Sequence, residues 1–284
     1  MNEIVPLNKA LGYDENDKLL ILNCTELGMS FSTTQATYEV INKENLATAS
    51  LMTPCPFSRI AIEGYRGTNV GIRLVLTSPF SYYRWEPITH LRSLLDGDGG
   101  FPKTIFDFWE HADSDEVYKE CTAQIEKAII YGFDVTHVSD HCGVLNFRPE
   151  LFSIYMDIAL DYKLPISLAN SEFETKVGFE YRKVAKNTGL VFPDFTVRAD
   201  YDNNKLSSVT DILPQIKPGV TECIIRPSKD TPEIQSITDD KNLRTNDFNT
   251  LNDSETFKEI LAQNNIKLIT FDTLRQYLRN TSKP

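Results

Sequence analysis

Short apolar runs rich in β-branched residues alternate along this chain with longer amphipathic stretches of helical period. This alternation constrains the fold most, because repeated strand and helix units build a parallel sheet covered by helices. Eight runs predict strands, at residues 18–23, 47–52, 70–77, 134–139, 165–169, 195–198, 221–226 and 267–271. Five stretches predict helices, at residues 32–44, 114–132, 148–163, 207–216 and 254–265. We therefore expect an α/β fold of the (β/α) barrel type with about seven or eight strands.

The repeating rhythm is interrupted by two long insertions, at residues 78–112 and 228–252. Neither insertion has low complexity, and the first contains both tryptophans of the chain. Loops of this length in a compact domain usually form lids or binding walls. Because no internal repeat or linker divides the chain, we predict a single domain over residues 1–284 with these two insertions.

The charge and cysteine content exclude several classes of partner. Forty acidic residues against 29 basic residues give a net charge of -11, which disfavours nucleic acid and anionic membranes as partners. The sequence has no apolar run long enough to span a bilayer, and its first residues lack the pattern of an export signal. The five cysteines are odd in number and lack CxxC spacing, so we expect reduced thiols and a cytoplasmic protein. A homo-oligomer is compatible with the sequence.

In barrels of this type the reactive groups lie at the carboxyl ends of the strands. The residues at those positions are Asn23, Thr25, Glu26, Arg73, Asp140, His141 and Arg226. Arg73 is unusual because it interrupts an apolar strand, where a guanidinium must be paired or must reach solvent. It faces either outward or into the pocket, and in the second case Glu26 is its expected partner.

Two further side chains near these strand ends allow more than one interpretation. His137 and His141 share one face of an extended strand, so they indicate a metal site, an acid/base pair or ordinary hydrogen-bonded strand residues. Cys142 follows His141 directly, but neighbouring residues on a strand point in opposite directions, which argues against a thiol and imidazole pair.

Several segments together resemble the YdjC/ChbG-like carbohydrate deacetylase family. LLILNCTELGMS resembles the family's LIINADDFGMS, and VGIRLVLTS resembles VGVHLTLTS. ATASLMTPCPF, YYRWEPI and LLDGDGGF resemble TSTSLMVPCPW, YRWGPV and LVDEDGYF. DVTHVSDHCGVLNFRPELF and PGVTECIIRPSKDTPEIQSITD resemble THLDSHMGTLFARPELF and PGVTEIIVHPALDTPELRAITD. The matches occur in the same order and extend over nearly the whole chain.

The resemblance implies a distorted (β/α) barrel and metal-dependent removal of acetyl groups from N-acetylated sugars. In this family the first aspartate of the DD pair acts as the base. The second aspartate, with the histidines of VHLTLT and DSH, holds a divalent ion such as Mg or Zn. The histidine of the later HP segment assists as an acid, and the ion activates water and polarises the amide.

Residue by residue, most of these functional positions differ in this chain. Thr25 stands at the base position, and Glu26 stands at the position of the second aspartate. Arg73 and Arg226 replace the first histidine ligand and the late acid. His141 is retained, although Ser139 and Asp140 precede it in swapped order. The former metal positions are therefore Glu26, Arg73 and His141.

Electrostatics disfavours a cation at this altered site. Two unit positive charges 4 Å apart repel by about 4 kcal/mol at an effective dielectric of about 20, and a divalent ion beside a guanidinium meets about twice that. We therefore expect no metal or other cofactor, unless the family mechanism persists with a divalent cation. In its place, the guanidinium of Arg73 is expected to neutralise Glu26.

Three functions are compatible with these residues. The first is a protein that binds a small sugar or an anionic sugar derivative but has lost the metal-dependent deacetylation. The second is a glycan hydrolase or deacetylase with rebuilt chemistry, in which Glu26, Asp140 and His141 act with an arginine. The third is a structural or regulatory pseudoenzyme whose barrel offers a surface to a partner.

The first insertion is rich in aromatic residues, and sugar rings stack well on aromatic faces. Most of these rings are expected to anchor the insertion to the barrel. Trp85, with Arg84 beside it in the YYRWEP segment, is our candidate for a wall of the ligand site.

Overall fold

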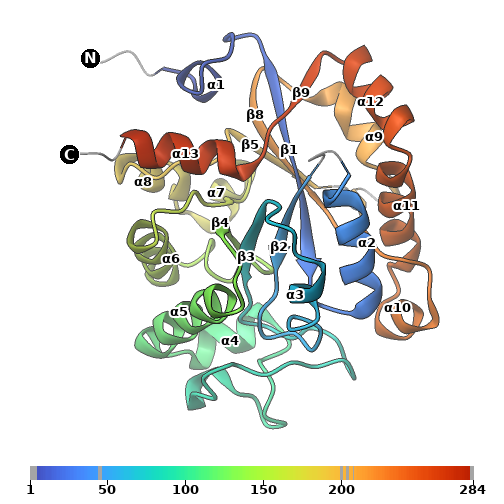
Figure 1. The fold of residues 1–284 in the computed structure, drawn as a ribbon. Coiled ribbons are helices and arrows are strands. Elements are labelled where there is room, and N and C mark those ends of the chain that lie inside the picture. Colours follow the sequence, from blue (N-terminus) through green and yellow to red (C-terminus); the bar gives the residue numbers. More distant parts are fainter. Residues whose placement is uncertain (1–4, 44–46, 199–200, 203–204, 207, 282–284) are drawn as a thin grey trace.

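A computed structural model describes residues 5–43, 47–198, 201–202, 205–206 and 208–281. A parallel sheet curls into a half-barrel and carries helices on its outer side (Figure 1). Among the described residues it has seven strands, which are β1 (Lys18–Leu27), β2 (Thr48–Leu51), β3 (Val70–Leu74), β4 (Val135–Asp140), β5 (Phe195–Arg198), β8 (Gly219–Ile225) and β9 (Ile266–Leu268). Their order is β4-β3-β2-β1-β8-β5, and β9 pairs with β1. The predicted distorted (β/α) barrel is confirmed.

The helices that cover the sheet agree with the amphipathic stretches of the sequence. They include α2 (Phe31–Ile41), α5 (Ser114–Ile130), α6 (Pro149–Asp161), α9 (Val209–Ile212) with the 3-10 turn η2 (Leu213–Gln215), and α12 (Ser254–Gln263). Ser30 caps α2 by accepting from the backbone N–H of Thr33, and Asp113 caps α5. The predicted helix ends at residues 44 and 207 lie outside the described residues.

Other elements escaped the sequence pattern because they are short or lack a clear apolar stripe. They are α1 (Leu7–Ala10), α3 (Ala61–Gly64), η1 (Arg92–Leu94), α4 (Ile105–His111), α7 (Glu172–Val177), α8 (Tyr181–Asn187), β6 (Tyr201–Asp202), β7 (Lys205–Leu206), α10 (Pro232–Ile237), α11 (Lys241–Asn252) and α13 (Phe271–Thr281). The predicted strand at 165–169 is only an isolated bridge, in which Ile166 pairs with Val138 of β4. This bridge extends the curl of the sheet beyond β4.

The side-chain alternation of the strands fixes what lies inside the half-barrel. A methyl group on Gly71 would meet the ring of His137 at 2.2 Å, so these two residues face the interior together. Ser139 continues that face of β4, where its hydroxyl donates to Ser50 Oγ at 3.2 Å. Arg73, two residues after Gly71 and paired in register with Ser139, therefore points into the half-barrel as well.

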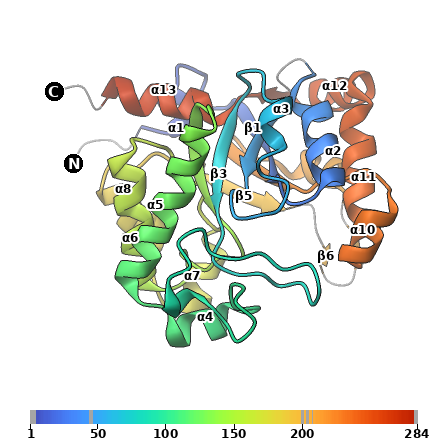
Figure 2. The same ribbon diagram turned by 60° about the horizontal axis from the view of Figure 1, so that its bottom comes forward.

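The two ends of the half-barrel differ. At the amino ends of the strands, α13 packs against β4, where Arg275 pairs with Asp134 and Phe271 stacks on His137. The carboxyl ends point down in Figure 1, towards the first insertion with α4 and the second insertion with α10 and α11. Figure 2 looks onto this end and shows the loops of the first insertion crossing towards α10. No helix in the described part of the chain is long and apolar enough to cross a membrane.

Candidate functional site

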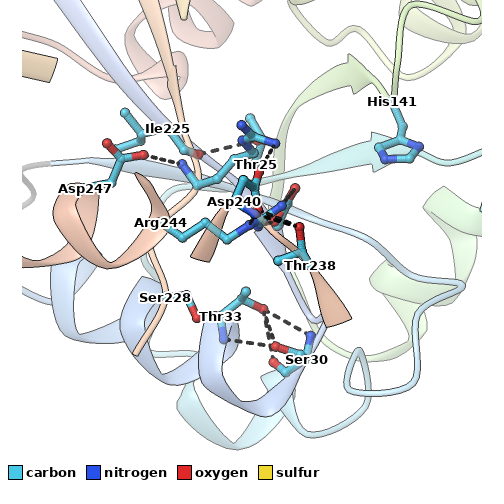
Figure 3. A network of polar contacts seen from close by, with 12 residues as sticks. Thr25, Ser30, Thr33, His141, Ile225, Ser228, Thr238, Asp240, Arg244 and Asp247 are labelled. Carbon is cyan, nitrogen blue, oxygen red and sulfur yellow. Dashed lines mark hydrogen bonds and ion pairs between the residues drawn. The ribbon is translucent and has the colours of Figure 1, made fainter. Parts of the chain in front are cut away.

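The candidate site lies where the carboxyl ends of the strands meet the second insertion. Thr25 and Glu26 lie near the carboxyl end of strand β1, and Arg226 follows strand β8 directly. Asp240 and Arg244 reach the same place from the start of α11 (Figure 3). Because neighbouring parallel strands end at the same edge of the sheet, these residues meet there although they come from distant parts of the sequence.

Glu26 is held by an arginine, but that arginine is not Arg73. Arg244 contacts both carboxylate oxygens of Glu26, with Nη2 at 3.3 Å from Oε1 and Nη1 closer to Oε2. Both side chains are almost fully buried. Burial by itself would raise the pKa of Glu26, but Arg244, Arg226 and Arg73 outweigh it and lower the pKa to about 2. The expected partner Arg73 contributes only through space, since it is too far away to form an ion pair.

Asp240 forms ion pairs with both Arg226 and Arg244. Its Oδ2 lies 3.0 Å from Arg226 Nη1, and its Oδ1 accepts from Arg244 Nε at 2.5 Å. Thr238 donates a further hydrogen bond to Oδ1 at 2.7 Å. These contacts fasten the second insertion to the ends of β1 and β8, so Glu26 helps to hold the insertion in place.

Arg73 is the exceptional charge of the site. Arg73 is 8% exposed, and its Nε atom is buried without a hydrogen-bond partner. Among the described residues, no hydrogen bond or ion pair to Arg73 is formed, although its charge acts on Glu26, Asp140 and His141. A buried guanidinium without a counter-ion is costly unless an anion binds to it.

Asp140 does not share the interior face of Ser139. Its Oδ2 accepts from the backbone N–H groups of Leu145 and Asn146 at 2.9 and 3.0 Å, and from Asn146 Nδ2 at 2.8 Å. Burial raises the pKa of Asp140 to about 6, against the effect of these donors and of Arg73. The swapped order of Ser139 and Asp140 thus turns the carboxylate of Asp140 away from the interior. On the other face it stabilises the turn after β4.

His141 lies just beyond β4 on the side away from Arg244 (Figure 3). Its backbone N–H donates to Leu74 O at 3.0 Å, and its Nδ1 lies 3.3 Å from Thr77 Oγ1. Burial and the charge of Arg73 lower the pKa of His141 to about 3, so the ring is neutral at pH 7. A neutral imidazole can accept or donate a hydrogen bond but supplies no charge.

The thiol of Cys142 approaches His141, contrary to the expectation for two neighbours on a strand. Cys142 Sγ lies 3.5 Å from His141 Nε2. Cys142 has left the strand and has a positive φ of 62°, which turns its side chain back. It is also the exposed thiol of the chain, because the other four cysteines are buried.

Asn23 and His137 belong to a polar layer inside the half-barrel and do not line an open pocket. Both are fully buried. Asn23 donates to Glu222 Oε1 at 2.8 Å, and His137 Nε2 lies 2.8 Å from Ser50 Oγ. Ser167 Oγ donates to the second oxygen of Glu222 at 2.6 Å. Thr25 is also fully buried, and its hydroxyl donates to Ile225 O at 3.4 Å.

Trp85 and Arg84 stabilise the first insertion. Trp85 is 2% exposed and donates from Nε1 to Thr77 O at 3.0 Å, while its ring meets His141 edge to face at 6.1 Å. Arg84 contacts Asp96, lies 3.1 Å from Asp98 Oδ1 and donates to Phe101 O. These contacts place Trp85 beside the site as packing and tie Arg84 to its own loop.

A cavity of about 520 Å³ opens between the two insertions. One wall is residues 79–83 of the first insertion, and the other is residues 236–240 of the second, which includes Asp240 of the ion-pair cluster. A volume of this size is typical of small-molecule sites. Residues of both insertions line this cavity, whereas Arg84 and Trp85 line a separate cavity of about 350 Å³.

The groups at the positions where the resemblance implies metal ligands do not fit a divalent cation. Glu26 is neutralised by Arg244, and Arg73 presents a guanidinium where the family has a histidine. The neutral imidazole of His141 is then the single side chain at these positions that could coordinate a metal ion. Among the described residues, no group of three His, Cys, Asp or Glu side chains is placed to hold a metal ion. We therefore derive no step that passes through a metal.

Arg244 and Asp240 are the site residues that the sequence did not reveal. Both lie in the second insertion, after the recognised segment that ends at Asp239. The one available signal was their spacing of four residues, which suits an ion pair on a helix. That spacing is common on solvated helices, so only the tertiary structure distinguishes this pair.

Comparisons with known proteins agree with the fold. A carbohydrate deacetylase of Thermus thermophilus is 34% identical over 147 residues, which is 52% of each chain. A carbohydrate deacetylase of Thermoanaerobacter pseudethanolicus is 24% identical over 268 residues, covering 91% of this chain and all of that one. The crystal structure of a putative cellobiose-phosphate cleavage protein from Enterococcus faecalis superimposes with a TM-score of 0.77 at 24% identity, over 91% of this chain and 99% of that one. The family model described as YdjC-like protein matches residues 19–263, and the chain therefore belongs to the YdjC-like protein family.

Proposed function

We propose that this protein binds a sugar derivative carrying a carboxylate or phosphate group, and that Arg73 holds that group. The observation that carries the proposal is the buried guanidinium of Arg73, which has no partner among the described residues. Arginine binds carboxylate and phosphate through paired N–H donors, so an anion would satisfy both its charge and its donors. The curated relatives named carbohydrate deacetylases support a sugar as the rest of the ligand.

The charges around the site support an anion over a cation. Arg226 and Arg244 are balanced by Glu26 and Asp240 through direct contacts. Arg73 makes no such direct contact, so its guanidinium is the one positive charge among these five side chains without an ion-pair partner, and Asp140 acts on it only through space. A carboxylate or phosphate entering the site would cancel that charge in a poorly solvated place, where the attraction is strong.

We further propose that the metal-dependent deacetylation of the family is absent. Thr25 cannot act as a base near neutral pH, and its hydroxyl is buried against Ile225 O. Glu26 is a very weak base, because its pKa is about 2. The arginines at positions 73 and 226 add positive charge where the family mechanism needs histidines.

The alternative of a rebuilt hydrolase needs Glu26, Asp140 and His141 to converge on one open space. The raised pKa of Asp140, about 6, is the observation in its favour, since such a carboxyl could accept a proton near neutral pH. Against it, Asp140 holds the turn after β4 on the face away from Ser139. The role of a partner surface is weakened by the cavity of about 520 Å³, which leaves room for a sugar.

The test compares anionic and neutral sugars on the wild-type protein and three variants. Isothermal titration with D-glucuronate, glucose 6-phosphate and glucose should show binding of at least one anion and weaker or no binding of glucose. Arg73→Gln should weaken anion binding at least tenfold, while Arg73→Lys should retain part of it. Arg92→Gln removes an exposed arginine of the first insertion and is the matched control.

Metal content and acetate release complete this test. The purified protein should contain no stoichiometric Zn or Mg, and it should release no acetate from N-acetylated chito-oligosaccharides with either ion added. One bound divalent ion together with steady acetate release would refute the loss of activity. Equal affinity of the wild-type protein and Arg73→Gln for both anions would refute the role of Arg73.

A further inference from the structure

We propose that the cavity between the two insertions is a subsite for a neutral sugar ring, with the ring of Tyr82 as its stacking platform. The ligand is then an oligosaccharide of at least two units, with its acidic unit at Arg73 and its neutral unit in the cavity. The placement of the acidic unit rests on the proposed function, whereas the subsite itself rests on the cavity, which residues 79–83 and 236–240 line.

Tyr82 is fully exposed although its neighbours are firmly anchored. Tyr83 donates from its hydroxyl to Met29 O at 2.7 Å, and Phe80 packs edge to face on Trp85 at 5.8 Å. The backbone on both sides of Tyr82 is thereby fixed, yet the Tyr82 side chain is 100% exposed. An aromatic ring held at the rim of a cavity with both faces free is suited to stack on the apolar face of a sugar.

The opposite wall supplies acceptors for sugar hydroxyl groups. Ser236, Thr238, Asp239 and Asp240 line this side, and their oxygens can accept hydrogen bonds from a hydroxylated ring. The exposed carboxylate of Asp239 would repel a second anionic unit, whereas Asp240 is already paired with Arg226 and Arg244. This combination of an aromatic wall and an acidic wall selects a neutral, hydroxyl-rich unit over an acidic one.

Two series of contacts lead from the cavity towards the ends of the strands. Asp240 lines the cavity and also pairs with Arg226 at the end of β8. Tyr83 of the cavity meets Trp85 edge to face at 6.3 Å, and Trp85 in turn meets His141 at 6.1 Å. The charge of Arg73 lowers the pKa of His141. We place the two linked units of the ligand along this line of contacts, with Asp240 as the residue that the cavity and the ion-pair cluster share.

The test uses three probes and two Tyr82 variants. The probes are D-glucuronate, the disaccharide β-D-glucuronosyl-(1→3)-N-acetyl-D-glucosamine, and the neutral disaccharide cellobiose. Tyr82→Ala removes the platform, and Tyr82→Phe keeps the ring without its hydroxyl. Because Tyr82 is fully exposed, neither change should unfold the protein. Phe106→Ala, which removes another exposed ring of the first insertion outside the cavity lining, is the control.

The acidic disaccharide should bind the wild-type protein about tenfold more tightly than glucuronate, which corresponds to about 1.4 kcal/mol. Tyr82→Ala should abolish this advantage and the binding of cellobiose, whereas Tyr82→Phe and Phe106→Ala should preserve both. The subsite is overturned if Tyr82→Ala leaves the affinity for both disaccharides unchanged, or if the wild-type protein binds neither. A Tyr82-dependent affinity for cellobiose together with no effect of Arg73→Gln on glucuronate would retain the subsite and reject the proposed anion site.

Discussion

The Glu26 and Arg244 pair should contribute measurably to stability, and the effect should depend on pH in a defined direction. Glu26→Gln removes the charge but keeps the size of the side chain, which leaves Arg244 buried with Asp240 as its remaining counter-ion. The folded protein lowers the pKa of Glu26 from an ordinary value of 4.5 to about 2. At about 1.4 kcal/mol for each pKa unit, this difference corresponds to about 3 kcal/mol.

The sign of the pH dependence follows from the lowered pKa. Because Glu26 binds a proton more readily in the unfolded chain, its ionised form stabilises the fold fully above pH 4.5 and progressively less as the pH falls towards 2. The difference in the free energy of unfolding between the wild-type protein and Glu26→Gln should therefore be about 3 kcal/mol at pH 7. It should decrease by roughly 40% between pH 5 and pH 3.5.

Urea unfolding followed by circular dichroism measures this difference at each pH. Glu180→Gln is the matched control, because Glu180 pairs with Lys183 at 2.9 Å on the surface, and exposed pairs contribute less than about 1 kcal/mol. A loss below about 1 kcal/mol for Glu26→Gln at pH 7 would refute the reasoning, since it would put the pair in the range of surface pairs. A difference that stays constant between pH 5 and pH 3.5 would refute the lowered pKa.

Three further predictions concern single side chains. Cys142 should be the thiol that iodoacetamide modifies first in the native protein, because the other four cysteines are buried. Mass spectrometry should also show that saturating glucuronate slows this modification. Equal labelling of all five thiols would contradict the structure. His141 should show no protonation between pH 5 and pH 8 in its imidazole NMR signals, since its pKa is about 3; a midpoint near 6.5 would place it in water. Trp85→Ala should lower the free energy of unfolding by about 3–5 kcal/mol through loss of packing, and a change below about 1 kcal/mol would assign Trp85 to an exposed wall instead.

Much of the fold follows from local patterns in the sequence. The β-branched runs and the amphipathic stretches predicted most strands and the longer helices, because side-chain periodicity and capping residues act over a few neighbours. Strand 165–169 was overestimated, since an apolar run of that length does not reveal how many hydrogen bonds its neighbours offer. Helix α11 was missed, since its mixed polar sequence has no clear apolar stripe and helices of this kind depend on tertiary packing.

The sequence by itself determined which side chains stand at the ends of the strands, including the guanidinium of Arg73 and the retained His141. Which of these groups touch was decided only by the tertiary structure. The partner of Glu26 comes from residue 244, more than 200 positions away, and a single exchange of Ser139 and Asp140 moves a carboxylate to the other face of a strand. Ion pairing depends on distances of a few ångströms across the fold, and local sequence patterns carry no information about such distances.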